Sequence, residues 1–160
     1  MGIVLYRVDE RLIHGQVVIG WGSQLNPRRY VVVDDKLAAS DWEQELYRLS
    51  LPEGVSAEFV SRADAKKMVP AWQDEGLRSV LLTRDVATML SLAEAGVLEG
   101  VAVNVGGIHH APGRTQVRSY LYLDDEDRKR LQRLEELGVT VTARDLPDSV
   151  RVSLHALLKE

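Results

Sequence analysis

The sequence predicts a single α/β domain: one doubly wound, mostly parallel sheet of about six or seven strands with helices on both faces. Short apolar runs alternate about six times with segments of helical periodicity, which is the pattern of a parallel sheet covered by helices. Several runs are continuously apolar, as in strands buried on both sides. The chain has 160 residues, enough for one domain with a substantial core, so we expect residues 1–160 to form one unit.

The predicted strands are short runs rich in Val, Ile and Leu, bounded by turn-forming residues. They cover residues 3–6, 30–33, 55–60, 79–83, 101–105, 118–123 and 139–142. The stretch from 150 to 158 fits either a last short strand or a last helix. Because parallel strands end at the same edge of a sheet, we expect the loops after the first, fourth and fifth strands to line one cleft.

The predicted helices lie between these strands, at residues 17–25, 40–51, 61–72, 85–96 and 124–138. Ser40 is expected to cap the second helix, with Glu43 three residues later as in a capping box. Pro70 is expected to kink the third helix or to end it early. Asp85 is expected to cap the fourth, and acidic residues cover the first turn of the fifth, where they favour the positive end of the helix dipole.

Composition excludes several classes of protein. The formal net charge of −4 gives no support to nucleic-acid binding, which needs a basic face. The absence of cysteine excludes disulfides, thiolate metal sites and cysteine nucleophiles. The sequence has no stretch of signal-peptide character and none long enough to span a bilayer, so a cytoplasmic location is expected.

The loop between the first strand and the first helix, residues 8–17, holds the strongest candidates for chemistry. His14 is the candidate nucleophile, because a neutral imidazole can form a covalent intermediate and a nearby helix N-terminus disfavours its protonation. Arg11 is suited to binding phosphate or carboxylate, or it forms a structural pair with Asp9 or Glu10. Asp9 either orients the His14 ring or caps the loop backbone. Glu10 is expected to be solvated.

A second loop, residues 106–116, contains glycines and is also suited to an anion. Glycine lets backbone N–H groups approach phosphate oxygens, and Arg114 adds a positive charge. The loop matches neither a P-loop nor a dinucleotide-binding fingerprint. Across the two loops, five residues are expected to contact the substrate: Gly15, Gln16, Gly106, Gly107 and Thr115.

The adjacent pair His109-His110 does not predict a metal site, because neighbouring side chains on an extended strand point to opposite faces. We expect neither a metal nor a cofactor. The roles of these two histidines, and of Arg84 after the fourth strand, stay open at this point. No Gly-x-Ser-x-Gly elbow of a serine hydrolase is present in the sequence.

The same residues resemble the enzyme IIB component of the mannose/fructose/sorbose family of the bacterial phosphotransferase system. The run from Arg7 to Val17 is similar to that family's phosphorylation-site loop. The resemblance extends over nearly the whole chain, through residues 104–109, 113–115, 124–126, 137–139 and 146–149. Arg114 stands where a lysine is expected from the family, which keeps the charge.

The resemblance implies a single IIB-like phosphocarrier domain over residues 1–160. It implies that His14 accepts a phosphoryl group from a phosphohistidine of a separate IIA protein and that Arg11 contacts this group. The group then passes to a sugar imported through the IIC and IID membrane subunits, with the protein attached peripherally to the transporter. The implied activity is that of a protein-N(pi)-phosphohistidine–sugar phosphotransferase. Other IIB families use phosphocysteine, so the lack of cysteine agrees with the histidine type. The sugar stays unidentified, and a homo-oligomer stays open.

Two alternatives use the same residues differently. The domain could be a regulatory module that binds a phosphorylated metabolite, or one that acts only in phosphorylation-dependent regulation. It could also be a small hydrolase that uses its histidines as general bases. A relay differs from both because it predicts an acid-labile, alkali-stable phosphoryl group on His14.

Overall fold

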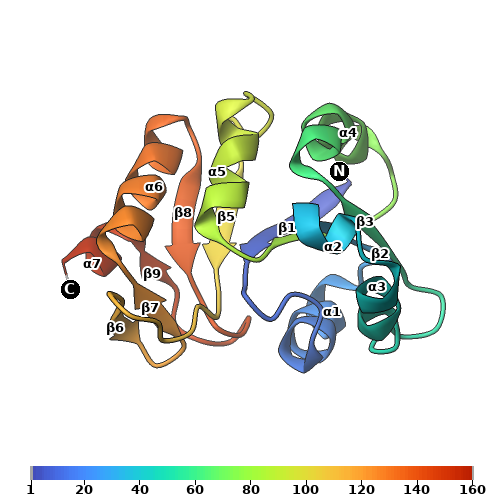
Figure 1. Cartoon of the computed structure of the whole chain (residues 1–160), viewed down its shortest axis with the longest axis horizontal. Helices are drawn as coiled ribbons and strands as arrows, with labels where there is room; N and C mark the ends of the chain where they lie inside the picture. Colours follow the sequence, from blue (N-terminus) through green and yellow to red (C-terminus); the bar gives the residue numbers. More distant parts are fainter. Residues whose placement is uncertain (1, 160) are drawn as a thin grey trace.

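A computed structural model of the protein describes residues 2–159 and contains a central seven-stranded sheet (Figure 1). The strand order is β3-β2-β4-β1-β5-β8-β9, and all neighbours are parallel except β8 and β9. These strands are β1 (Ile3–Val8), β2 (Arg29–Val33), β3 (Ser56–Val60), β4 (Ser79–Thr83), β5 (Ala102–Val105), β8 (Thr140–Ala143) and β9 (Val152–Ser153). A separate antiparallel hairpin is formed by β6 (Thr115–Arg118) and β7 (Leu121–Leu123). The predicted α/β fold with a mostly parallel sheet is confirmed.

Helices cover both faces of this sheet. They are the π-helix η1 (Gln16–Trp21), α1 (Gly22–Leu25), α2 (Asp35–Ala38), α3 (Asp41–Arg48), α4 (Arg62–Asp74), α5 (Val86–Glu94), α6 (Asp125–Glu136) and α7 (Leu154–Leu158). Residues of α4, α5 and α6 pack on one face and residues of η1 and α2 on the other, and Figure 1 shows α1 and α3 below β1 and β2. The segment predicted as the first helix therefore begins as a π-helix, a form that is frequent at functional sites.

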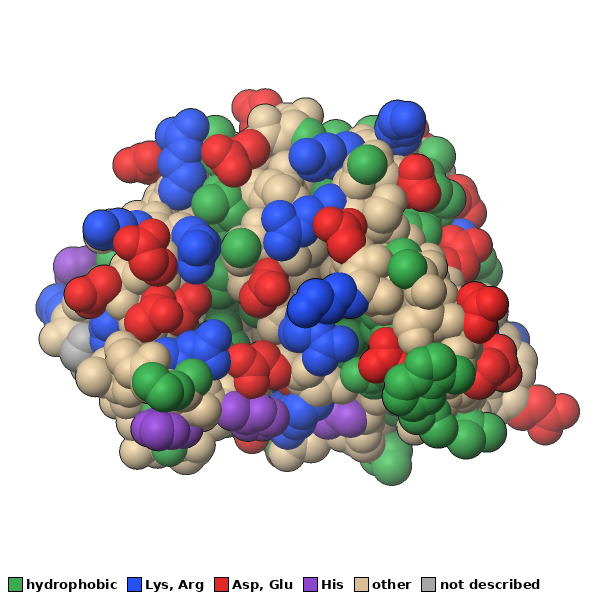
Figure 2. All heavy atoms as spheres, in the orientation of Figure 1, with side chains coloured by type: hydrophobic (Ala, Val, Ile, Leu, Met, Phe, Trp, Pro, Cys, Tyr) green, Lys and Arg blue, Asp and Glu red, His purple; other side chains and the backbone are tan. Residues whose placement is uncertain are grey.

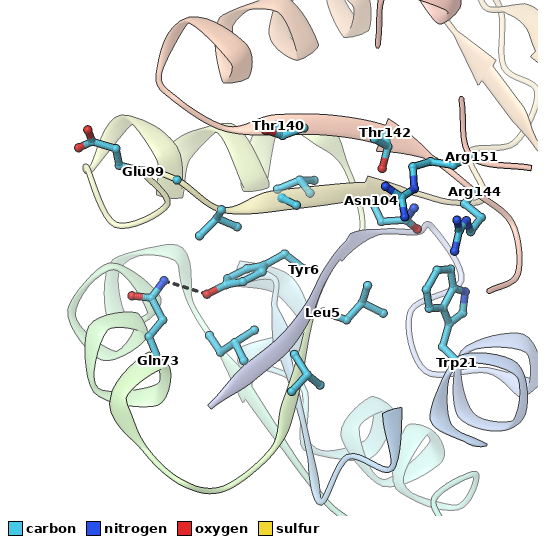
Figure 3. A pocket seen from close by; sticks show the side chains of 16 residues that line it. Leu5, Tyr6, Trp21, Gln73, Glu99, Asn104, Thr140, Thr142, Arg144 and Arg151 are labelled. Carbon is cyan, nitrogen blue, oxygen red and sulfur yellow. Dashed lines mark hydrogen bonds between the residues drawn. The ribbon is translucent and has the colours of Figure 1, made fainter. Parts of the chain in front are cut away.

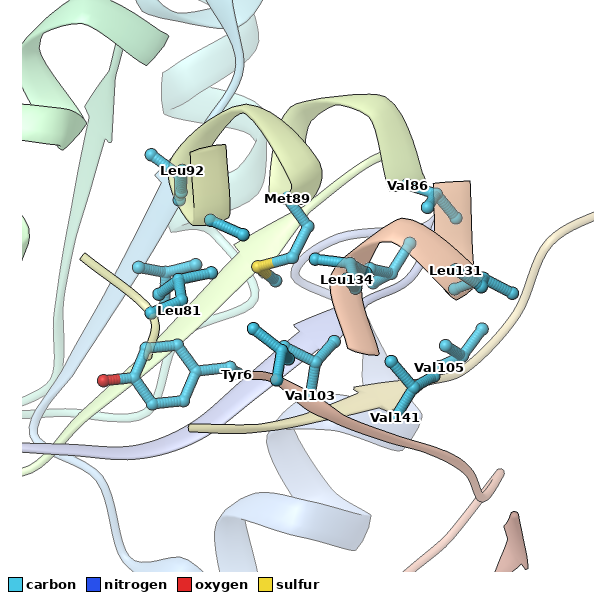
Figure 4. Packing of buried hydrophobic residues seen from close by; sticks show 14 of the residues in the cluster. Tyr6, Leu81, Val86, Met89, Leu92, Val103, Val105, Leu131, Leu134 and Val141 are labelled. Carbon is cyan, nitrogen blue, oxygen red and sulfur yellow. The ribbon is translucent and has the colours of Figure 1, made fainter. Parts of the chain in front are cut away.

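Alternate residues of the strands enter two hydrophobic cores. Val31 and Val33 of β2 pack in the larger core with residues of α4, α5 and α6, and Figure 4 shows the part of it between α5, α6 and the sheet. Tyr30 and Val32 of the same strand point to the other face, into a smaller core with Val17 of η1. Strands β2 and β4 are buried along their whole length, which explains the apolar runs at residues 30–33 and 80–82.

Pro70 neither ends nor shortens its helix, so the expected early end is wrong. Helix α4 continues to Asp74, four residues beyond the proline. Buried side chains stand on both sides of it: Val69 is fully buried and Trp72 is 3% exposed. Packing on the core stabilises the last turn more than the missing hydrogen bond of the proline destabilises it.

Several other boundaries differ from those predicted. The stretch 118–123 is the end of β6, a turn and β7 rather than one strand, because the turn carries no glycine or proline that would mark it. Helix α3 ends at Arg48, and the Ser40 side chain makes no capping hydrogen bond within the described chain. The short helix α2 was not expected. Asp85 caps α5 as predicted, and the stretch from 150 to 158 holds both β9 and α7.

Candidate functional site

The loop after β1 is anchored by Arg7, whose side chain has no exposed surface. Its guanidinium donates to Asp9 Oδ2 at 3.1 and 3.3 Å and to the side-chain oxygen of Asn104 on β5. It also donates to the backbone carbonyls of Arg144 and Asp145, after β8, at 2.8 and 3.0 Å. A buried cation is tolerated only when it is paired and hydrogen-bonded, and here the pairing ties the carboxyl ends of three adjacent strands together.

Asp9 is fully buried between Arg7 and Arg11. Its Oδ1 accepts from the backbone amide and from Nε of Arg11, both at 3.0 Å, and its Oδ2 accepts from Arg11 Nη2 at 3.0 Å. Burial alone would raise the pKa of this carboxyl, but the hydrogen bonds from Arg11 and the charges of both arginines outweigh burial and lower the pKa. Asp9 is therefore a carboxylate at neutral pH.

The His14 ring is oriented by the backbone. Its Nδ1 lies 2.7 Å from the carbonyl oxygen of Leu12, and this nitrogen must carry the ring proton because a carbonyl can only accept. Leu12 is fully buried with φ of +56°, a strained conformation for a residue with a side chain. Nε2 of His14 is 3.9 Å from Asp9 Oδ2, beyond hydrogen-bond distance. Of the two roles predicted for Asp9, the structure has the backbone cap, through the amide of Arg11.

The His14 imidazole is neutral at pH 7. Burial lowers its pKa, against the opposing effects of the Leu12 carbonyl and the Asp9 charge. With the proton on Nδ1, the free lone pair lies on Nε2, which is buried and has no hydrogen-bond partner within residues 2–159. A neutral imidazole with a free lone pair is a competent nucleophile.

We expect ¹⁵N NMR of the unphosphorylated protein to show His14 as the Nδ1–H tautomer. A pH titration followed by the same ¹⁵N signals should give a pKa for His14 below the ordinary histidine value of about 6.5, because burial disfavours the imidazolium. A His14→Gln variant identifies the signals. An Nε2–H tautomer, or a pKa above the ordinary value, would contradict this geometry.

The Glu10 side chain is only 23% exposed and is held by two partners, so the expectation of a solvated side chain is wrong. Its Oε1 accepts from Arg114 at 2.8 Å, and its Oε2 accepts from the backbone amide of His109 at 3.0 Å. The backbone amide of Glu10 donates to the carbonyl of Gly107 at 2.8 Å. These bonds join the loop after β1 to the loop after β5, and the two loops therefore line one site as predicted.

Gly106 and Gly107 make room for two arginine side chains. A Cβ atom on Gly106 would lie 2.1 Å from Arg7 Nη2, and one on Gly107 would lie 2.8 Å from Arg11 Nη2. The amide of Gly106 donates to the carbonyl of Val8 at 2.7 Å, so it is not the free phosphate donor that the sequence suggested. These glycines are required because guanidinium groups occupy the space of their missing side chains.

A Gly106→Ala substitution is expected to destabilise the fold by about 2–3 kcal/mol, because the enclosed Arg7 side chain has nowhere to move. Urea denaturation measures the change. Gly76→Ala is the matched control, since a Cβ there has no atom within 4 Å. Equal denaturation midpoints for the two variants would show that Arg7 is not held as described.

The other predicted contact residues divide between two places. Gln16 Oε1 accepts from Arg11 Nη1 at 2.7 Å, so Gln16 positions that arginine. Gly15 is exposed, with helical backbone angles and open space around the position of a Cβ. Thr115 is the first residue of β6, and its hydroxyl accepts from Arg128 Nη2 at 2.7 Å. The structure thus places Gly15 and Gln16 in the site and Thr115 in the hairpin beside it.

The loop after β4 does not contribute to the site around His14. The prediction that the loops after the first, fourth and fifth strands line one cleft is therefore wrong for the fourth strand. Arg84 Nε lies 3.6 Å from Asp34 Oδ1, and both line a different cleft, of about 540 Å³, at the ends of β2 and β4. Strand β4 lies between β2 and β1, and Arg84 lies on the β2 side, where it pairs with Asp34.

The loop after β8 contributes to the site instead of the loop after β4. The Asp145 carboxylate lies 3.8 Å from Arg11 Nη2, and the Asp145 carbonyl accepts from Trp21 Nε1 at 3.0 Å. Sequence reasoning assigned no role to Asp145, Asn104 or Arg7. Of these three residues, only Arg7 could have been noticed in the sequence, because an arginine next to an apolar strand must be paired when it is buried.

A separate groove of about 590 Å³ lies along β1, β5 and β8. Figure 3 shows Trp21, Asn104, Arg144 and Arg151 gathered at one end of it. Strand β1 pairs with β5 only through residues 6–8, so residues 3–5 of β1 have no partner on β5 and border the groove. Neither His14 nor Arg11 lines it, but Asn104 does, so the groove adjoins the residues that hold Arg7 without reaching the histidine.

The two adjacent histidines have separate neighbours. His109 Nδ1 lies 3.1 Å from Glu10 Oε2, and the His110 ring packs edge-on against Tyr122, with ring centroids 5.6 Å apart. Among residues 2–159, no group of three or more histidine, aspartate or glutamate side chains is placed to hold a metal ion. Within the same range, none of the helices combines the length and the apolar character needed to cross a bilayer.

The fold and the site define a parallel α/β domain that holds a neutral histidine and an arginine around one buried carboxylate at the carboxyl edge of its sheet. The family model described as "PTS system sorbose subfamily IIB component" matches residues 3–160. The chain therefore belongs to this family of phosphotransferase-system IIB components.

Individual relatives agree with this assignment. The fructose-specific EIIB component of Bacillus subtilis is 31% identical over 159 residues, which cover 99% of this chain and 97% of that protein. The mannose-specific EIIAB component of Escherichia coli is 32% identical over 163 residues, and the chain spans about half, 49%, of its length. The crystal structure of the IIBSor domain of the sorbose permease from Klebsiella pneumoniae superimposes with a TM-score of 0.88 at 28% identity, covering 99% of this chain and 97% of that one.

Proposed function

We propose that this protein is the cytoplasmic phosphoryl-relay subunit of a sugar phosphotransferase system and that His14 carries the phosphoryl group. The observation that supports this best is the arrangement around Asp9 Oδ2. Arg11 Nη2 is 3.0 Å from this oxygen and His14 Nε2 is 3.9 Å from it, so a neutral nucleophile and a phosphate-binding cation share one buried carboxylate.

The proposed chemistry needs only a nucleophile, positioning and neutralisation of oxygen charge. A ring nitrogen of His14 attacks the phosphorus of a phosphohistidine on IIA, and the nitrogen–phosphorus bond of the donor breaks as the donor imidazole leaves with its electron pair. In the second step a sugar hydroxyl oxygen attacks the same phosphorus, the bond to His14 breaks, and the hydroxyl proton is released. Arg11 stabilises the phosphoryl oxygens in both steps, and no cofactor takes part.

The resemblance implies phosphorylation at N(pi), which is Nδ1. In the unphosphorylated structure this nitrogen carries the proton that it donates to Leu12. Phosphorylation there requires the ring to release the Leu12 carbonyl and to move its proton to Nε2. The nearby Asp9 carboxylate, 3.9 Å away, would then stabilise an Nε2–H group, which gives Asp9 the orienting role in the phosphorylated state.

The partners proposed for this single domain follow from the relay. A IIA protein or domain is the donor, and this is supported by the mannose-specific relative, which is named EIIAB and of which this chain matches about half. The IIC and IID membrane subunits are the acceptor side, where the protein attaches peripherally. Docking to either partner would use the loop that presents His14.

The test is to incubate the protein with ³²P-labelled phosphoenolpyruvate, the general phosphotransferase proteins and a IIA protein. We expect one label per chain, labile in acid, stable in alkali and dependent on IIA. Binding of phosphorylated metabolites without any label would favour the regulatory module. Hydrolysis of a phosphate ester that is independent of IIA would favour the hydrolase.

A further inference from the structure

Helix α3 carries an exposed apolar stripe, formed by Trp42 and Leu46 of the helix and by Leu49, the residue that follows its last turn. These side chains are 68%, 56% and 83% exposed. Spacings of four and three residues place them on one side of the helix. Figure 2 shows the resulting hydrophobic cluster over α3, next to acidic side chains. Scattered exposed leucines are ordinary, but a contiguous apolar surface of this kind marks an interaction site.

The opposite side of α3 attaches the helix to the domain. The Tyr47 ring packs against Phe59 of β3, with ring centroids 6.1 Å apart, and Gln44 Nε2 donates to the carbonyl of Leu37 at 2.9 Å. None of the residues of α3 is fully buried. The stripe therefore does not serve the core, and a partner outside the chain is needed to cover it.

A groove connects the stripe to the loop that carries His14. It has a volume of about 320 Å³ and is lined by Ile13, Trp42, Glu43, Leu46, Tyr47 and Ser50. Ile13 lies at the buried end of the groove and directly precedes His14, so the groove adjoins the His14 loop. The stripe thus continues the surface that a phosphoryl acceptor has to approach.

The helix that carries the stripe is acidic. Residues 41–49 contain three acidic residues and one basic residue, a formal net charge of −2. Asp41 and Glu43 lie in the first turn of α3, around Trp42. A second copy of the chain would bring the same negative charge, which disfavours self-association through this face. A partner with apolar side chains flanked by Lys and Arg fits it.

We propose that this stripe and groove dock a cytoplasmic segment of the IIC or IID membrane subunits. Cytoplasmic loops of membrane proteins carry an excess of Lys and Arg, which matches the acidic rim. Apolar side chains of such a segment would cover Trp42 and Leu46, and the contact would hold His14 against the transporter. The inference rests on the proposed relay function and adds to it the surface used in the second transfer.

The experiment compares the wild type with a Trp42→Ser/Leu46→Ser double variant, with Met68→Ser as control, a partly exposed apolar residue of α4. Two quantities are measured: uptake of label from IIA, and co-sedimentation with inverted vesicles that contain the IIC and IID subunits. We expect the double variant to take up label within about twofold of the wild-type rate but to bind the vesicles at least ~10-fold more weakly. Binding of the wild type should weaken as salt is raised, because exposed charges are screened.

Four results would overturn the inference. The first is that the double variant binds the vesicles as strongly as the wild type does. The second is that the double variant takes up no label, which would show that the stripe docks IIA. Equal binding of the wild type to vesicles of the same lipid without the subunits would show a lipid surface. A wild-type dimer that the double variant loses would show a second copy. If the wild type takes no label from IIA while its vesicle binding still requires the stripe, the relay fails and the docking surface stands.

Discussion

A His14→Ala variant is expected to take up no phosphoryl label from IIA, a loss on the order of 10³-fold or more, because removing a covalent nucleophile removes the reaction path. The substitution takes away a side chain that is 18% exposed and makes one hydrogen bond, to the Leu12 carbonyl, so the fold should be kept. Circular dichroism and urea denaturation check the fold, and acid gels measure the label.

The matched controls are the other three histidines of the chain, at positions 109, 110 and 155. Alanine variants at these positions should keep the wild-type rate of label uptake. If His14→Ala still takes up the label at that rate, the relay assignment to His14 is wrong. A loss of label at position 109 alone would instead assign the phosphoryl group to the loop after β5.

Asp9→Asn is expected to lower the free energy of unfolding by about 3–5 kcal/mol, although the two side chains have nearly the same size. Removing one member of a buried ion pair leaves the other charge uncompensated, and here two arginines lose their shared carboxylate. An asparagine oxygen accepts hydrogen bonds but carries no charge, and its NH₂ group would face guanidinium donors. Asp148→Asn, at an exposed position, is the control and should change stability by less than about 0.5 kcal/mol.

The same carboxylate predicts a dependence on pH. The pKa of Asp9 is lower in the folded protein than in the unfolded chain, so its contribution to stability is complete above the unfolded value, about 3.9. The contribution is lost as the pH falls from that value through the folded pKa. Denaturation midpoints of the wild type and Asp9→Asn should therefore converge below pH 4. A difference that stays constant down to pH 2 would contradict the role of charge.

The layers of the fold could be predicted because their cause is local. Strands β2 and β4 contain apolar runs, at residues 30–33 and 80–82, because both of their faces are covered, and such a run is visible in one stretch of sequence. The β6–β7 hairpin was missed because its turn at residues 119–120 has neither glycine nor proline. The path of α4 through Pro70 was missed because core packing around Val69 and Trp72 decides it, and packing is not visible in the sequence of the helix.

The candidate site could be predicted only as far as a single loop extends. His14, Arg11 and Gln16 are near one another in sequence and are near one another in the structure. Asn104 on β5 and Asp145 after β8 are 97 and 138 residues away from Arg7, and they have no local signal. Glu10 was misjudged for the same reason, because its partners His109 and Arg114 belong to another loop.

The two glycines after β5 set limits on how such a site can change or be transplanted. Each is matched to one long side chain on the other loop, Gly106 to Arg7 and Gly107 to Arg11. A homologue with a larger residue at position 106 should therefore carry a shorter one at position 7, so these positions should co-vary. An engineer who grafts the His14 loop onto another α/β scaffold has to move both loops together, since the first has no room for its arginines without the second.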